Sequence, residues 1–169
     1  EIRLSLVGSE MCIRDRSVER ALKVARFKSG KYTIERPLHF GAAIAGSHPS
    51  LEKLYSDYGI PLGEAFQLRD DLLGVFGDSA ETGKPSGDDL REGKRTVLMA
   101  IANENADKTE RELFDKYIGD PNLTGDQISQ LQEAITKTGA VSKVEAMITE
   151  FTNQALAALT HSGLSLSLI

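Results

Sequence analysis

The sequence predicts an all-α protein. Apolar residues recur at intervals of three and four positions over most of the chain, which is the spacing of one helix face. Strand-like alternation is scarce, aromatic residues make up only 6% and Trp is absent. Glycine and proline separate the periodic segments from one another. The length of 169 residues fits one domain, and we expect roughly six or seven helices in it.

The first half of the chain contains three expected helices and one expected loop. Residues 17–28 and 33–46 each carry apolar residues at helical spacing. Residues 50–76 form the longest periodic segment, which Pro61 is expected to bend. Residues 77–93 contain four glycines and one proline and are expected to form a loop.

The second half continues the helical pattern. Asp120-Pro121-Asn122 and Gly139 interrupt it, and Thr124 is expected to begin a helix. The expected helices of this half cover residues 94–104, 108–118, 127–138 and 141–160.

Residues 1–16 do not share this pattern. They have no clear hydrophobic period, and they resemble a translated sequencing-adapter read-through. We therefore expect residues 1–16 to be non-native to the fold, and we assign no function to Cys12, which lies within them.

Composition excludes several classes of protein. Lys and Arg number 20 against 25 Asp and Glu, a formal net charge of −5, which argues against a nucleic-acid partner. A single cysteine excludes an intramolecular disulfide scaffold. No run approaches the ~18–20 apolar residues needed to span a bilayer, and charged residues interrupt the opening stretch where a secretory signal would lie. We expect a cytoplasmic protein that does not span a membrane.

The segment 61–78 carries the most specific pattern. At ~100° per residue, one polar face of an otherwise apolar helix collects Gly63, Gln67, Asp70, Asp71, Gly74 and Asp78. A helix this apolar is expected to be buried, so its carboxylates would need a cationic partner. Mg²⁺ is typically held by one or two carboxylates plus substrate phosphates, so the pattern indicates half of a metal–phosphate site. An ordinary solvated acidic face is the alternative.

Two basic segments support the metal–phosphate interpretation. Lys84 and Lys94 lie in or beside the glycine-rich loop, where the backbone can approach a ligand closely and ammonium groups can reach a phosphate. Lys28 and Tyr32 are four positions apart and are expected to face one cavity. Alone, each segment is better explained as a solvated surface. The loop does not have the spacing of a Walker A motif or of an EF-hand.

Together these segments resemble the trans-type polyprenyl diphosphate synthases, and most closely geranylgeranyl-type synthases of actinobacteria. The resemblance rests on KSGKY at 28–32, GEAFQLRDDLLGVFGD at 63–78 and TGKPSGDDLREGKRT at 82–96, in that order. It runs from about residue 18 to at least 102, and more loosely to 159. It implies that residues 17–169 are the C-terminal part of a synthase domain.

The resemblance implies a fold, a reaction and a cofactor. The fold is the isoprenoid synthase type I bundle of α-helices around a central cavity, here a partial domain, with a homodimer as the usual complete assembly. The reaction condenses isopentenyl diphosphate with the carbocation of an allylic diphosphate. Two Asp-rich motifs on facing helices hold three Mg²⁺ ions, which stabilise the departing diphosphate.

The resemblance also implies roles for individual residues. Asp70 and Asp71 match the start of the second Asp-rich motif, with Asp70 the expected direct metal ligand. Residues matched to substrate or diphosphate binding are Lys28, Tyr32, Gln67, Lys84 and Lys94. Residues matched to catalysis are Lys28, Ser29 and Lys84, with Ser29 orienting the leaving group.

Two departures from the family pattern leave a second hypothesis open. Gly74 stands where the motif has its last Asp, and Asp78 is not assumed to replace it. The first Asp-rich motif and the isopentenyl diphosphate site are not in this chain, so we expect the chain to be a fragment that is inactive alone. The alternative is a non-catalytic, synthase-like subunit that modulates a catalytic partner; the retained Asp70 and Asp71 favour the enzyme.

Overall fold

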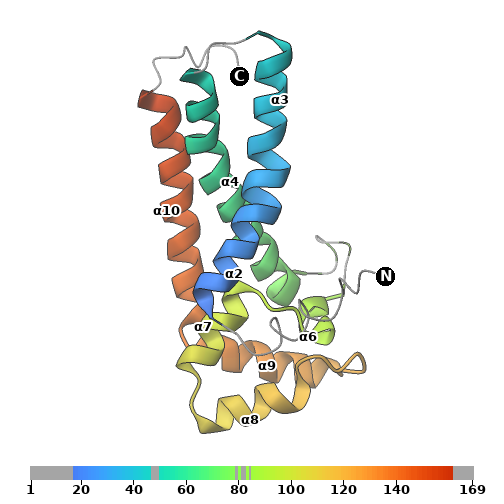
Figure 1. Cartoon of the computed structure of the whole chain (residues 1–169). Coiled ribbons are helices and arrows are strands. Elements are labelled where there is room, and N and C mark those ends of the chain that lie inside the picture. Colours follow the sequence, from blue (N-terminus) through green and yellow to red (C-terminus); the bar gives the residue numbers. More distant parts are fainter. Residues whose placement is uncertain (1–16, 47–49, 79, 81–82, 84, 162–169) are drawn as a thin grey trace, which may run out of the picture. The chain divides into compact units, whose positions relative to one another are not determined.

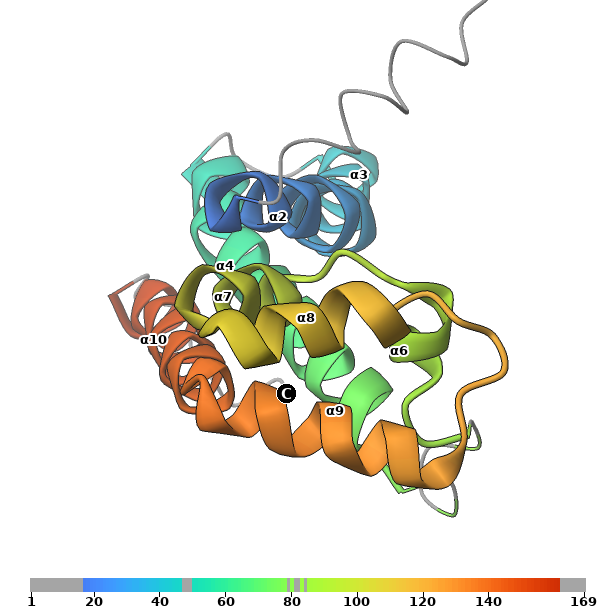
Figure 2. The same ribbon diagram turned by 90° about the horizontal axis from the view of Figure 1, so that it is seen from below.

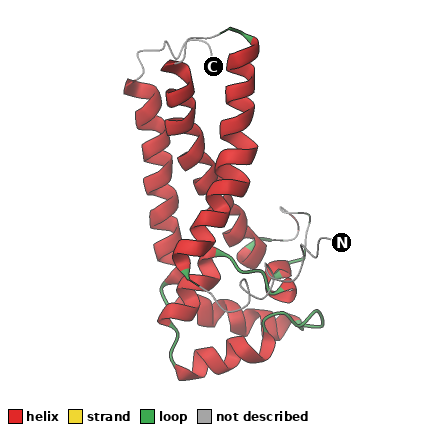
Figure 3. Ribbon diagram, viewed as in Figure 1, coloured by secondary structure: helices red, strands yellow, loops and turns green. Residues whose placement is uncertain are grey.

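The computed structural model of the chain describes residues 17–46, 50–78, 80, 83 and 85–161. All regular elements in these residues are helices (Figure 3), which confirms the predicted all-α class. The chain divides into two compact units. In the described residues, the first unit comprises residues 17–22 and Asp71–Val141, and the second comprises Lys23–Asp70 and residues 142–161.

One long helical run opens the described chain. Helix α2 covers Val18–Ala25, the π-helix η1 covers Arg26–Glu35, and α3 covers Arg36–Ile44 (Figure 1). The expected helices 17–28 and 33–46 are therefore joined into one run, and the break expected between residues 28 and 33 is wrong. π-Helices are rare in proteins, and those that occur often lie at functional sites. This one contains the whole KSGKY segment.

Helix α4 covers Ser50–Phe76 and matches the expected boundaries. It continues through Pro61 without interruption. Helix α10 covers Ala140–His161, and its residues 142–161 belong to the second unit. Within this unit they run side by side with α3 and α4 (Figure 1). Arg69 on α4 donates two hydrogen bonds to the carboxylate of Glu145 on α10, at 2.6 and 2.7 Å.

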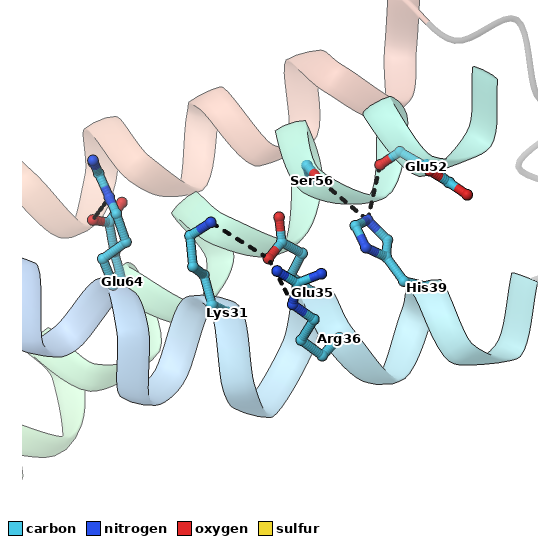
Figure 4. Close-up of polar contacts among 8 residues, drawn as sticks. Lys31, Glu35, Arg36, His39, Glu52, Ser56 and Glu64 are labelled. Atoms are coloured by element: carbon cyan, nitrogen blue, oxygen red, sulfur yellow. Dashed lines mark hydrogen bonds and ion pairs between the residues drawn. The ribbon is translucent and has the colours of Figure 1, made fainter. Parts of the chain in front are cut away.

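Polar contacts also follow the run from η1 to α3 (Figure 4). The Nζ atom of Lys31 and the Nε atom of Arg36 lie 3.9 and 3.8 Å from Oε2 of Glu35, whose side chain is buried. His39 Nε2 lies 3.1 Å from the hydroxyl of Ser56 on α4. This histidine therefore has a structural contact between helices, and the sequence offered no metal-ligand spacing for it.

Among its described residues, the first unit contains four further helices, which Figure 2 shows from below. They are α6 (Asp88–Glu92), α7 (Val97–Asn105), α8 (Lys108–Tyr117) and α9 (Gly125–Lys137). Their apolar side chains form the core of this unit, and the fully buried ones include Leu90, Val97, Leu98, Ile101, Leu131 and Ile135. The expected helices 108–118 and 127–138 are confirmed, as is 141–160 in α10.

Two expected boundaries in this unit are wrong. The expected loop 77–93 contains the short helix α6, which is bracketed by Gly87 and Gly93 at φ values of 73° and 65° and anchored by the buried Leu90. The helix expected at 94–104 begins at Val97 instead. The hydroxyl of Thr96 accepts a hydrogen bond from the Met99 N–H at 3.2 Å, which caps the helix there.

No helix in the described part of the chain has the length and apolar character that a membrane crossing requires.

Candidate functional site

The polar residues of α4 divide into a buried set and an exposed set. Gln67 is 7% exposed and Asp71 3% exposed, and they are one helical turn apart. Asp70 is exposed, as are Phe66 and Leu73, at 61% and 45%. The expectation that both carboxylates are buried is therefore wrong for Asp70. Neighbouring helix residues point ~100° apart, so a helix packed on one side buries only one of the two.

In the second unit, Gln67 connects Ser29 with Asp70. The hydroxyl of Ser29 donates to Oε1 of Gln67 at 2.6 Å, and both residues are buried. The amide Nε2 of Gln67 donates to Oδ2 of Asp70 at 3.3 Å. These contacts join the KSGKY segment to the Asp-rich segment.

Two glycines allow η1 and α4 to approach this closely. A Cβ atom built on Gly63 would lie 2.5 Å from the Cα atom of Gly30 and 2.6 Å from the carbonyl oxygen of Ser29. A Cβ atom on Gly30 would lie 3.0 Å from the carbonyl oxygen of Ile60. Any larger residue at position 63 would therefore push the two backbones apart and lengthen the hydrogen bond from Ser29 to Gln67.

In the first unit, Lys94 lies between two buried carboxylates. Its Nζ atom is 2.9 Å from Oδ2 of Asp89 and 3.6 Å from Oδ1 of Asp71. The side chains of these aspartates are 11% and 5% exposed, and that of Lys94 is 32% exposed. Buried carboxylates require a cationic partner, and Lys94 supplies one here.

Sequence reasoning missed Asp89. It lies in the quoted segment 82–96, but no role was assigned to it, because the segment was expected to be a loop. The backbone N–H of Lys94 donates to the carbonyl of Asp89 at 3.0 Å, so the two residues belong to one tight turn around the end of α6. The one feature of the sequence that could have indicated this contact is the spacing of five positions between Asp89 and Lys94, which carry opposite charges.

The remaining predicted site residues are exposed or lie outside the described residues. Lys28 is exposed, and Tyr32 is 78% exposed. Asp78 is exposed and accepts a hydrogen bond from the backbone N–H of Ala80 at 2.9 Å. Lys84 lies outside the described residues.

The donor chemistry of these residues fits Mg²⁺. No group of three or more His, Cys, Asp or Glu residues within the described ranges has the arrangement of a self-sufficient metal cage. Mg²⁺ is usually held by one or two carboxylates plus substrate phosphates rather than by such a cage. Asp70 and Asp71 are two adjacent carboxylates of the kind that such a site uses.

Comparison with known proteins identifies the family. The profile of the polyprenyl synthetase family matches residues 8–136, and the chain belongs to that family. The match begins inside the segment 1–16 expected to be non-native; that segment lies outside the described residues, and its origin stays a prediction.

Individual relatives agree with this assignment. The geranylgeranyl pyrophosphate synthase of Corynebacterium glutamicum, solved in complex with isoprenyl diphosphate and magnesium, is 42% identical with a TM-score of 0.88. That similarity covers 98% of this chain and 49% of the synthase. The geranylfarnesyl diphosphate synthase of Aeropyrum pernix is 39% identical over 125 residues, 74% of this chain and 38% of the relative. The geranylgeranyl diphosphate synthase of Sulfolobus acidocaldarius is 37% identical over 97 residues, 57% of this chain and 29% of the relative.

These comparisons confirm the resemblance stated from the sequence, including its restriction to part of a family chain. The chain spans about half the length of the solved synthase and less of the curated relatives.

Proposed function

We propose that this chain is the diphosphate-binding part of a prenyltransferase. The complete enzyme would condense isopentenyl diphosphate with an allylic diphosphate to a longer trans-polyprenyl diphosphate of geranylgeranyl type. The observation that carries the proposal is the buried face of α4, where Gln67 contacts Ser29 and Asp71 faces Lys94. The similarity to a geranylgeranyl synthase complexed with isoprenyl diphosphate and magnesium supports it.

Asp70 and Asp71 are proposed to hold Mg²⁺. Asp70 is exposed, so a metal–diphosphate complex can reach its carboxylate, and the amide of Gln67 orients that carboxylate from one turn earlier. When bound, Mg²⁺ supplies positive charge against the negative charge that grows on the departing diphosphate. We propose three such ions in the complete enzyme, as the family resemblance implies.

The basic residues are proposed to bind diphosphate oxygens. Lys94 is partly exposed and held between two carboxylates, and Lys28 is exposed on η1. Lys84 belongs to the same set by the family resemblance. Ammonium groups fixed beside a leaving diphosphate stabilise its charge in the transition state more than in the ground state.

Ser29 and Tyr32 are proposed to act on opposite ends of the allylic substrate. For Ser29 we propose a part in orienting the leaving diphosphate through Gln67, to which its hydroxyl donates at 2.6 Å. Tyr32 presents an exposed aromatic ring, for which we propose contact with the reacting carbons. The homodimer and the cytoplasmic location stay predictions.

A chimera tests the proposal. The matching half of the Corynebacterium synthase is replaced by residues 17–161 of this chain, so that the other half supplies what the chain lacks. We expect Mg²⁺-dependent formation of a prenyl diphosphate longer than the allylic substrate, detected by incorporation of labelled isopentenyl diphosphate. The unaltered synthase is the positive control, and the chimera with Asp71→Asn is the negative one.

A chimera that folds, by circular dichroism and thermal unfolding, yet forms no product would contradict the proposal. That result would favour the alternative, a non-catalytic subunit.

A further inference from the structure

The side chain of Gln132 on α9 joins two of the segments on which the family resemblance rests. Its amide Nε2 atom donates to the backbone carbonyl of Val75 at 2.6 Å and to the hydroxyl of Ser86 at 3.3 Å. An amide NH2 group carries two N–H donors on one nitrogen, so it can serve both acceptors at once. Val75 belongs to the Asp-rich segment 63–78 and Ser86 to the glycine-rich segment 82–96, whereas Gln132 belongs to neither. All three residues lie in the first unit.

The contact with Val75 caps the end of α4. The last four carbonyls of an α-helix have no partner within the helix, and α4 ends at Phe76. The carbonyl of Leu73 accepts from the backbone N–H of Gly77 at 2.8 Å. The carbonyl of Val75, a residue that is 0% exposed, accepts from Gln132. Loss of the amide would leave a buried carbonyl without this donor, and such a loss favours a shift of the helix end.

The same face of α9 holds the residues that precede α6. Ile128 lies four positions before Gln132, and residues at this spacing share a helix face. A Cβ atom built on Gly87 would lie 2.7 Å from Cγ2 of Ile128, so the backbone of Gly87 packs directly on α9. On the other side, Nη1 of Arg91 on α6 donates to the carbonyl of Ser86 at 2.9 Å. The corner formed by Ser86 and Gly87 is therefore held between α9 and α6.

We propose that Gln132 is a positioning residue of the metal–diphosphate site: its amide fixes the end of the Asp-rich helix α4 against the corner Ser86–Gly87 from which α6 begins. This inference rests on the proposed function. A diphosphate that contacts both motif segments needs them at a fixed separation, because segments that must first be ordered bind a ligand less tightly. Gln132 acts through the two backbones and does not itself touch the ligand.

The test measures binding of inorganic diphosphate with Mg²⁺ to the 169-residue chain by isothermal titration calorimetry. Gln132→Met keeps the length of the side chain and removes both donors. Loss of a group that orients a metal ligand typically weakens affinity by about 10–100-fold, and we expect the Kd of Gln132→Met to rise by about 10-fold, because Gln132 acts at one further remove. Gln130→Met is the matched control, since Gln130 is exposed on the same helix. We expect it to bind like the unaltered chain.

Calorimetry separates positioning from a loss of folding. A substitution that only destabilises the chain lowers the fraction of folded chains, so it lowers the measured stoichiometry and leaves Kd unchanged. A substitution that displaces the corner raises Kd in chains that are folded. Gln132→His keeps one N–H donor, so its Kd should lie closer to that of the unaltered chain than to that of Gln132→Met.

Gly87→Ala tests the position of the corner while Gln132 is kept. The added Cβ atom would meet Ile128 and push the corner away from α9, so we expect a rise in Kd similar to that of Gln132→Met. Gly139→Ala is the control. Its φ of 75° is close to the 73° of Gly87 and gives a similar backbone strain, but its added Cβ atom would meet open space. Should Gln132→Met not fold, Gly87→Ala decides the question.

The outcomes separate the two proposals. An unchanged Kd in Gln132→Met and Gly87→Ala, with a higher Kd in Asp70→Asn, would overturn the role of Gln132 and leave the proposed function standing. An unchanged Kd in Asp70→Asn, or no binding of magnesium diphosphate by the unaltered chain, would overturn both.

Discussion

The adjacent residues Asp70 and Asp71 have different surroundings. Asp71 is 3% exposed and faces Lys94, whereas Asp70 is exposed and accepts from the amide of Gln67. An exposed carboxylate can meet an incoming metal–diphosphate complex, while a buried one is held in a fixed place by its partners. For the proposed metal site, the pair would combine access with rigidity, as preorganised electrostatic stabilisation requires.

Ser29→Ala tests the buried contact between η1 and α4. The substitution removes the donor of the 2.6 Å hydrogen bond to Gln67 and leaves the amide oxygen of Gln67 without it. We expect the free energy of unfolding to fall by about 1–3 kcal/mol, measured by chemical denaturation.

Thr33→Ala is the control for Ser29→Ala. The hydroxyl of Thr33 donates to the Lys28 carbonyl on the exposed side of the same π-helix. Its removal should change stability by no more than about 0.5 kcal/mol, as is usual for surface positions. Equal losses in the two variants would show that the buried contact has no special weight.

At the residue scale, the motif residues on α4 could be predicted and Asp89 could not. Gln67 and Asp71 follow from helical spacing, because residues four apart share a face. The place of Asp89 depends on the lack of a side chain at Gly74 and on the turn that α6 makes. Neither feature appears as a periodic pattern in the sequence. The exposure of Asp70 and Phe66 was also missed, because apolar neighbours in sequence do not show which side of a helix is covered.

At the scale of elements, helix starts were predictable where a capping residue precedes the helix. Thr124 was expected to begin a helix, and its hydroxyl accepts from the backbone N–H of Gln127 at 3.3 Å. Helix α6 was missed because five residues are too few to show a period. The π-helix η1 was missed because it joins two helices across Gly30, and that glycine has a packing role against α4 that the sequence alone does not reveal.

The cap of α8 gives a pH-dependent prediction. The pKa of Asp107 is lowered, chiefly because the backbone N–H of Glu110 donates to its carboxylate, and further by the ammonium of Lys137. The unfolded chain therefore takes up this proton at a higher pH than the folded chain does. The stability that Asp107 contributes is present above its unfolded pKa of about 3.9 and is lost as the pH falls through the folded pKa.

Asp107→Asn checks this dependence, since an asparagine still accepts the capping hydrogen bond but does not titrate. We expect the unaltered chain to lose stability relative to the variant as the pH is lowered from about 6 to 2, the range that spans the titration of a carboxyl group. A difference between the two chains that stays constant over this range would contradict the shifted pKa.

At the scale of the whole molecule, the chain spans about half of the solved synthase that it matches. Several large apolar side chains are exposed in the described residues, namely Val24, Phe27, Tyr32, Phe40, Ile44, Phe66, Leu73 and Leu156. The family fold could be predicted because the order and spacing of three motifs are specific to it. What covers these side chains could not be predicted, since a hydrophobic pattern does not specify the partner that an apolar side chain contacts.

The chain alone should be inactive. One Asp-rich segment does not complete the metal set implied by the family, so assays with allylic diphosphate, isopentenyl diphosphate and Mg²⁺ should give no product above background. Turnover by the isolated chain would contradict its proposed status as a part of the catalytic centre.

The central claim is that the Asp-rich segment of α4 holds the metal that stabilises the leaving diphosphate. It is tested most directly by kcat of the chimera carrying Asp70→Asn, compared with the chimera carrying Asp78→Asn, at saturating Mg²⁺. Both aspartates are exposed, so burial does not bias the comparison. We expect Asp70→Asn to lower kcat by at least about 10²–10³-fold, with a smaller change in KM because charge on the diphosphate grows in the transition state. Asp78→Asn should have a much milder effect, and near-normal turnover with Asp70→Asn would contradict the claim.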